Sequence, residues 1–137
     1  MPMSVRPRAS RRTLAVLASV LVASVAMSMV LIAQTRRDFD VVARKYAFSV
    51  SGSDRSEIRV GQNDLVHVNF STDDIPHSFT IEDHGSSHYR IMRRAEAGKP
   101  VKFDFRADSP GRFRFYCSLT IDEKCKGMQG TLVVDPK

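Results

Sequence analysis

The chain has 137 residues, a formal net charge of +6, two cysteines, four histidines and no tryptophan, so its length allows one domain. The positive excess lies at the N-terminus, where residues 1–12 contain four arginines and no acidic residue. A nucleic-acid-binding domain would need such charge on its folded part, so the composition argues against nucleic acid as a partner.

Residues 13–33 form an uncharged apolar stretch with arginines on both sides. As a helix rising about 1.5 Å per residue, this stretch would span roughly 30 Å, the thickness of a bilayer core. A signal peptide cleaved after residues 24–26 is the alternative, although the apolar run continues beyond that point. We expect a transmembrane anchor at 13–33 behind a basic cytoplasmic arm at 1–12, because the arginines follow the positive-inside rule.

Both alternatives export the residues that follow the apolar stretch. We therefore expect a single-pass protein of the cytoplasmic (inner) membrane, with its C-terminal domain on the periplasmic or extracellular side.

Residues 34–44 are mixed and charged, and we expect a short linker there. From residue 45 to residue 137, short alternating segments are separated by turn residues, which predicts strands. The expected strands are 46–51, 57–60, 65–70, 78–82, 89–92, 101–106, 111–117 and 131–134. Strands this short and this regularly spaced predict an all-β domain, an antiparallel β-sandwich.

Alternation within two of these segments assigns side chains to faces. Val66, Val68 and Phe70 share one side of their strand, which places His67 on the other side, toward solvent. Phe103 and Phe105 likewise share a side, and we expect them in the core.

Both cysteines lie in the loop before the last strand, in the pattern Cys117-x7-Cys125-x2-Met128. Two thiols and a thioether in one short loop are soft ligands, and soft ligands suit copper. This loop is therefore the first candidate for a metal site.

A second candidate ligand is His77, which follows Pro76. Pro76 has no backbone N–H to give to a sheet, so we expect His77 at the boundary between a loop and a strand. His77 shares its parity with Phe79 and Ile81, which directs the imidazole toward the core side of the sandwich.

The segment DIPHSF at 74–79, followed by ADSPGRFRFYC at 107–117 and a loop ending in Met128, resembles the copper-binding domain of cytochrome c oxidase subunit II and, more broadly, the cupredoxins. The resemblance covers residues 45–137 and implies a Greek-key β-sandwich. It implies that an early histidine and residues of the last loop hold copper. The ligands then expected for one copper ion are His77, Cys117, Cys125 and Met128.

The loop also departs from the subunit II pattern, Cys-x3-Cys-x3-His-x2-Met. Ile121 takes the position of the second cysteine and Cys125 that of the histidine, so we do not expect a binuclear centre. Two thiolates, an imidazole and a thioether favour Cu(I). Copper(I) storage, delivery or resistance is therefore an alternative to electron transfer in a respiratory membrane, and zinc bound by Cys2His and water is a further alternative.

A metal-free protein is the third alternative for the two cysteines. In an exported domain a cysteine pair is often a disulfide, so a structural module with a Cys117–Cys125 bridge fits the same residues. No nucleophile or general-base pair stands out, and we expect at most a non-catalytic electron-transfer subunit of an oxidase.

Two polar clusters remain. Asp83, His84 and His88 suit either a second, hard-ligand metal site or a plain polar loop. The arginines at positions 90, 93 and 94 suit either a docking surface for an acidic redox partner or anionic headgroups, or a solvated strand edge. A copper-accepting protein is the corresponding partner if the chain delivers copper.

Overall fold

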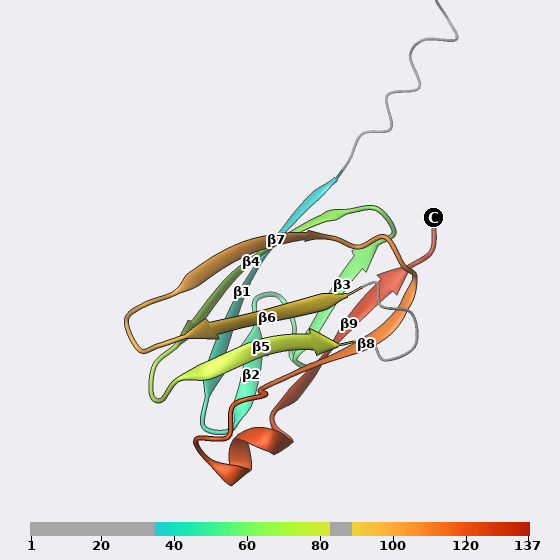
Figure 1. Ribbon diagram of the computed structural model, residues 1–137. Coiled ribbons are helices and arrows are strands. Elements are labelled where there is room, and N and C mark those ends of the chain that lie inside the picture. Colours follow the sequence, from blue (N-terminus) through green and yellow to red (C-terminus); the bar gives the residue numbers. More distant parts are fainter. Residues whose placement is uncertain (1–34, 83–88) are drawn as a thin grey trace, which may run out of the picture. The chain divides into compact units, whose positions relative to one another are not determined.

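The structure is a computed structural model that describes residues 35–82 and 89–137. These residues form nine strands and one 3-10 helix (Figure 1). Their bounds are β1 Arg36–Arg44, β2 Ala47–Val50, β3 Glu57–Gly61, β4 Leu65–Thr72, β5 His77–Glu82, β6 Arg90–Ala95, β7 Val101–Arg106, β8 Gly111–Tyr116, η1 Glu123–Gly127 and β9 Gln129–Asp135.

The strands form two sheets, one in the order β2-β1-β4-β7 and the other in the order β3-β9-β8-β5-β6. Buried phenylalanine rings join the two sheets. Phe70 of β4 lies 6.0 Å from Phe79 of β5 between ring centroids, and Phe103 of β7 lies 5.4 Å from Phe79. Phe48 of β2 meets Phe115 of β8 edge-on at 5.2 Å. The expected β-sandwich is therefore confirmed, with an aromatic core between its layers. Its sheets are mixed and not purely antiparallel as expected, because β1 pairs in parallel with β4 and β3 pairs in parallel with β9.

Alternation correctly assigned the faces of β4 and β7. Val66, Val68 and Phe70 are fully buried, whereas His67 lies on the outer side of β4, where its Nδ1 is 2.6 Å from Asp104 Oδ1. Phe103 is also buried, and Phe105 is half-buried against the same core. All eight expected strands occur, with ends shifted by a few residues.

The segment 34–44 differs from the linker that we expected, because Arg36–Arg44 forms β1. This strand pairs in parallel with β4 and antiparallel with β2. Val41 and Ala43 are fully buried on its inner face, and Phe39 packs against the same core. The folded domain thus begins before Lys45, because apolar residues alternate with polar ones even within this charged segment.

The basic arm at 1–12 and the anchor expected at 13–33 lie outside the described residues. Within residues 35–82 and 89–137, no helix has the length and apolar character needed to cross a bilayer.

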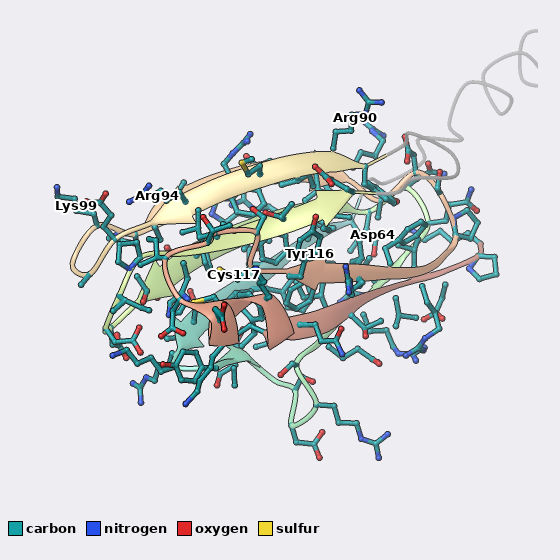
Figure 2. The ribbon with its side chains drawn as sticks, turned by 60° about the horizontal axis from the view of Figure 1, so that its bottom comes forward. Asp64, Arg90, Arg94, Lys99, Tyr116 and Cys117 are labelled. Carbon is teal, nitrogen blue, oxygen red and sulfur yellow. The ribbon has the colours of Figure 1, made fainter. Side chains whose placement is uncertain are left out.

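The outer surface carries the basic residues of β6 (Figure 2). Arg90 and Arg94 are exposed, and Figure 2 shows them projecting away from the sandwich. Met92, between them, is 60% exposed, so this edge of the five-stranded sheet is basic with one apolar side chain. Arg93 is exposed too, but its guanidinium also lies 5.5 Å from the centroid of the Phe103 ring.

Candidate metal centre

Three of the four expected ligands, His77, Cys117 and Cys125, come together. They lie at the end of the sandwich where Figure 1 shows η1. Cys117 directly follows β8, Cys125 lies within η1, and Met128 directly precedes β9. His77 is the first residue of β5, at the loop-to-strand boundary that Pro76 predicted. Residues forty positions apart in the sequence therefore meet because β5 and β8 are neighbours in one sheet.

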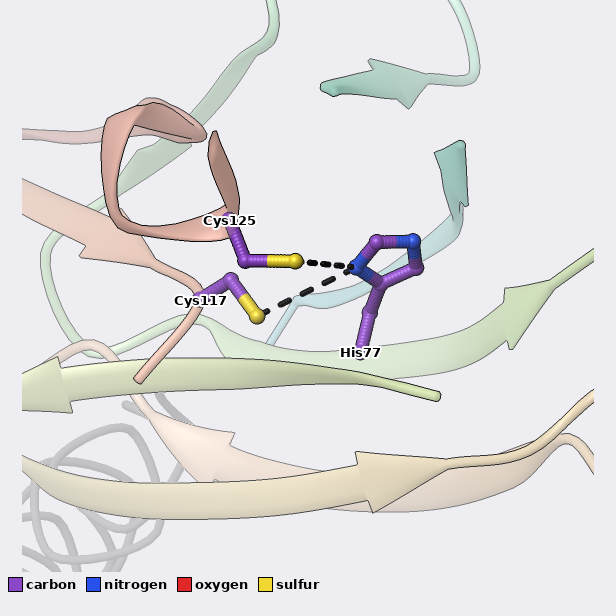
Figure 3. A group of neighbouring side chains, drawn as sticks. All are labelled: His77, Cys117 and Cys125. Atoms are coloured by element: carbon purple, nitrogen blue, oxygen red, sulfur yellow. Dashed lines mark hydrogen bonds between the residues drawn. The ribbon is translucent and has the colours of Figure 1, made fainter. Parts of the chain in front are cut away.

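His77, Cys117 and Cys125 form one cluster (Figure 3). His77 Nδ1 lies 3.9 Å from Cys117 Sγ and 3.8 Å from Cys125 Sγ, and the three candidate ligand atoms all lie within 4.8 Å of one another. The three side chains are at most 1% exposed, and both cysteines are free thiols. The chain thus holds two sulfurs and one ring nitrogen close together and away from water.

Met128 is 1% exposed and belongs to the same buried core. Its backbone carbonyl accepts the N–H of Cys117 at 3.3 Å, and its N–H donates to the carbonyl of Cys125 at 3.1 Å. Its main chain therefore links the segments that carry the two cysteines. A role for its thioether as a fourth ligand stays a prediction.

Asp74 is a site residue that our sequence reasoning missed, although it opens the DIPHSF segment. Its Oδ1 lies 2.9 Å from His77 Nε2. The Nε2–H tautomer donates its proton to this carboxylate and leaves Nδ1 unprotonated. Nδ1 is the nitrogen directed at the two sulfurs, so this tautomer is the one that can bind a metal there. The signal in the sequence was an acid three residues before the histidine.

The Asp74 carboxylate is itself held by several donors. Oδ2 accepts the backbone N–H of Lys45 at 2.6 Å, and Oδ1 accepts the N–H of Ile75 at 2.6 Å and the Thr72 hydroxyl at 3.1 Å. Burial raises the pKa of Asp74, but the hydrogen bonds from Lys45, Ile75, His77 and Thr72 outweigh it and hold that pKa well below its usual range. Asp74 is therefore a carboxylate at neutral pH.

Hydrogen-bond donors also surround Cys117. The backbone N–H of Ser78 lies 3.4 Å from Cys117 Sγ and the Ser78 hydroxyl lies 3.8 Å from it. Ser118 and Thr80 fix that hydroxyl, with oxygen–oxygen distances of 3.0 and 3.2 Å from Ser78 Oγ. Donors aimed at a sulfur stabilise negative charge on it, as a metal-bound thiolate requires.

Burial and the neighbouring Cys117 raise the pKa of the Cys125 thiol. In the metal-free protein Cys125 is therefore protonated at neutral pH, and a metal that binds it must displace this proton.

The donor set fits a soft metal ion. Two sulfurs and one imidazole nitrogen in a water-excluded position suit Cu(I) well, and the same atoms suit Zn(II) with a fourth ligand. Of the other histidines, only His67 lies within the described residues, and it is not part of this cluster. His67 pairs with Asp104 on the outer sheet face, while His84 and His88 lie in the segment 83–88, outside the described residues.

Comparison with known proteins shows structural similarity at low sequence identity. No protein-family model and no curated sequence matches the chain. A chain of a heme-copper terminal oxidase dimer is 18% identical, with a TM-score of 0.61, and the match covers 90% of this chain and 95% of that one. Auracyanin A, a blue copper protein from Chloroflexus aurantiacus, is 17% identical with a TM-score of 0.57, covering 73% of this chain and 99% of its own.

The periplasmic domain of subunit II of cytochrome oxidase from Bradyrhizobium japonicum is 16% identical with a TM-score of 0.59. That match covers 73% of this chain and 84% of the domain. Residues 35–82 and 89–137 therefore have the cupredoxin fold and resemble the periplasmic domain of cytochrome oxidase subunit II.

Proposed function

We propose that this protein binds one copper ion through His77, Cys117 and Cys125 and serves in electron transfer. The observation that carries this proposal is the buried cluster in which both thiol sulfurs lie within 4 Å of one imidazole nitrogen. Copper bound there would supply one-electron chemistry by changing between Cu(I) and Cu(II). The likeness to a blue copper protein and to an oxidase subunit supports the same class of function.

The residues of the chain would keep the site rigid and dry. The sandwich fixes His77 and Cys117 at the ends of paired strands, Asp74 orients the imidazole, and Ser78 donates to the sulfur of Cys117. Such preorganisation lets a bound metal change its charge with little movement of its ligands. Met128 is the proposed fourth ligand.

A second candidate is storage or delivery of Cu(I), because Cys125 supplies a second thiol. Cys125 lies in a short helix whose neighbours Lys124 and Lys126 are exposed. A ligand on a short surface helix suits transfer of a metal to a copper-accepting protein better than a ligand inside a strand does. The third candidate, a metal-free module with a Cys117–Cys125 disulfide, uses the same nearby sulfurs.

The proposed location follows from the sequence alone. Residues 13–33 would anchor the chain in the cytoplasmic membrane, with 1–12 on the cytoplasmic side and the sandwich outside the cytoplasm. The proposed partner is a redox protein of a respiratory membrane, such as the other subunits of an oxidase.

The test is a copper titration of the reduced, metal-free full chain, followed by absorption and electron spin resonance. We expect one copper per chain and an intense thiolate-to-Cu(II) band that disappears reversibly on reduction. His77→Ala should weaken copper binding by at least about a hundredfold. Loss of a direct ligand should lower the metal affinity at least as much as loss of a residue that only orients a ligand. His67→Ala is the matched control, because His67 lies on the outer sheet face and should leave the site intact.

Each other outcome identifies another candidate. Stoichiometric Cu(I) binding with no coloured Cu(II) form, lost in Cys125→Ser, would favour copper delivery over electron transfer. If neither oxidation state of copper binds the reduced chain, the copper proposal is wrong and the disulfide module takes its place.

A further inference from the structure

The turn between β1 and β2 contacts both segments that carry site residues. The backbone N–H of Lys45 donates to Asp74 Oδ2 at 2.6 Å, and the other oxygen of Asp74 holds His77. The hydroxyl of Tyr46 donates to Asp122 Oδ2 at 2.7 Å. Two adjacent residues of one turn therefore reach the histidine segment and the second cysteine segment.

Asp122 is the N-cap of η1, the helix that contains Cys125. Its Oδ1 accepts the N–H of Lys124 at 3.0 Å, and its backbone carbonyl accepts the N–H of Cys125 at 3.0 Å. The ammonium of Lys124 also lies 5.4 Å from the centroid of the Tyr46 ring. Tyr46 thus holds the first turn of the helix through its hydroxyl and its ring.

The two cysteines differ in how they are fixed. Cys117 continues β8, which is paired on both sides within its sheet, and its N–H is bonded to the carbonyl of Met128. Cys125 lies in a helix of five residues, which has little stability of its own. Yet Cys125 is fully buried, so its burial depends on contacts that hold η1 against the sandwich.

We propose that Tyr46 is a positioning residue, which acts with Lys45 as a two-point clamp that keeps Cys125 at metal-binding distance from His77. The clamp is a property of the metal-free protein. Its consequence for the metal rests on the proposed function, because the clamp would slow the opening of η1 through which a metal leaves.

The first test measures thiol reactivity in the reduced, metal-free full chain. Tyr46→Phe removes the hydroxyl and keeps the ring, and it is made in the Cys117→Ser and Cys125→Ser backgrounds so that each thiol is followed alone. We expect the reaction rate of Cys125 with a disulfide reagent such as DTNB to rise about fivefold, the effect of losing one ordinary hydrogen bond. The rate for Cys117 should stay within a factor of about 1.5, because the sheet holds it.

Tyr89→Phe is the control for a general loss of stability. The Tyr89 hydroxyl is 3.1 Å from both the N–H and the carbonyl of Ser109, away from η1, so its removal should not favour one thiol over the other. A second variant, Asp122→Asn, keeps an oxygen for the helix cap and should raise the Cys125 rate by less than Tyr46→Phe does. Equal increases for both thiols, or none, would refute the clamp.

The second test follows transfer of Cu(I) from the loaded chain to a chelator. Tyr46→Phe should speed this transfer about fivefold while the Cu(I) stoichiometry stays the same. A selective rise in Cys125 reactivity in a chain that binds no copper would support the clamp and reject the proposed function. Normal copper binding with unchanged thiol reactivity in Tyr46→Phe would support the proposed function and refute the clamp.

Discussion

At the scale of single residues, Asp74 determines how the candidate site is ordered. One carboxylate accepts hydrogen bonds from two backbone N–H groups, from the Thr72 hydroxyl and from His77. It therefore fixes the loop before β5 and the orientation of the imidazole together. A neutral side chain of the same size would keep some of these bonds but not the charge that strengthens them.

The low pKa of Asp74 predicts a loss of stability in acid. Because folding lowers this pKa, the carboxylate contributes stability at pH values above its unfolded pKa of about 3.9, and this contribution is lost as the pH falls toward the folded pKa. The free energy of unfolding of the reduced, metal-free chain should thus fall below about pH 4. Urea denaturation between pH 6 and pH 3 measures it.

Asp74→Asn should lower stability at pH 6 and make the acid-induced fall shallower than in the wild type. Asp54→Asn, in an exposed turn, controls for the loss of one carboxylate. Parallel pH curves for wild type and Asp74→Asn would show that Asp74 does not carry this dependence.

At the scale of elements, the sequence predicted eight of the nine described strands, because each alternates in hydrophobicity between clear turn residues. It missed β1, where Phe39, Val41 and Ala43 alternate with polar neighbours, because the charged start of that segment suggested a linker. The cluster of His77 with the two cysteines was predicted from two local motifs together with their resemblance to the copper domain of subunit II.

The contact between Tyr46 and Asp122 was not predictable in this way. It joins residues 76 positions apart, and no local pattern marks either of them as a site residue. Contacts of this kind depend on how the two sheets pack, which hydrophobic alternation alone does not fix.

The pairing of β8 with β9 predicts a strict requirement for glycine at position 130, which lies opposite Phe115. A Cβ atom there would overlap the Phe115 ring and lie 2.6 Å from the backbone carbonyl oxygen of Ser56. We expect Gly130→Ala to lower the free energy of unfolding by about 1–3 kcal/mol, measured by urea denaturation. Gly127→Ala in η1 is the control, because apart from its chain neighbours and the backbone of its own helix no atom lies within 4 Å of the added Cβ. It should change stability by less than about 0.5 kcal/mol.

At the scale of the whole molecule, Asp64 ties together segments at the end of β9 that lies away from η1. Its side chain is only 2% exposed. Its carboxylate accepts hydrogen bonds from Lys137 Nζ at 2.6 Å and from the N–H of Gly61 at 3.0 Å. Arg37 Nε lies 3.5 Å from Asp64 Oδ2. The Lys137 hydrogen bond lowers the pKa of Asp64, which is a buried carboxylate shared by the first strand, the β3–β4 turn and the residues after β9.

Lys137→Met tests this ion cluster. It should lower the free energy of unfolding by about 1–2 kcal/mol, because a buried carboxylate loses a charged donor while Gly61 and Arg37 remain. Lys99→Met removes an ion pair with Glu96 that is exposed on both sides, so it should cost less than about 0.5 kcal/mol. Thermal or urea unfolding compares them, and equal effects would mean that the burial of Asp64 is unimportant.

The expected ligands and the turn that holds them belong to different layers of the sandwich. His77, both cysteines and Met128 belong to strands of the five-stranded sheet or to the segment joining two of them, whereas Lys45 and Tyr46 connect strands of the four-stranded sheet. A bound metal would thus cross-link residues of the five-stranded layer, and contacts from the four-stranded layer would hold those residues in place. Metal retention and adhesion between the layers would then be thermodynamically linked, and heat that separates the layers would release the metal in the same cooperative event.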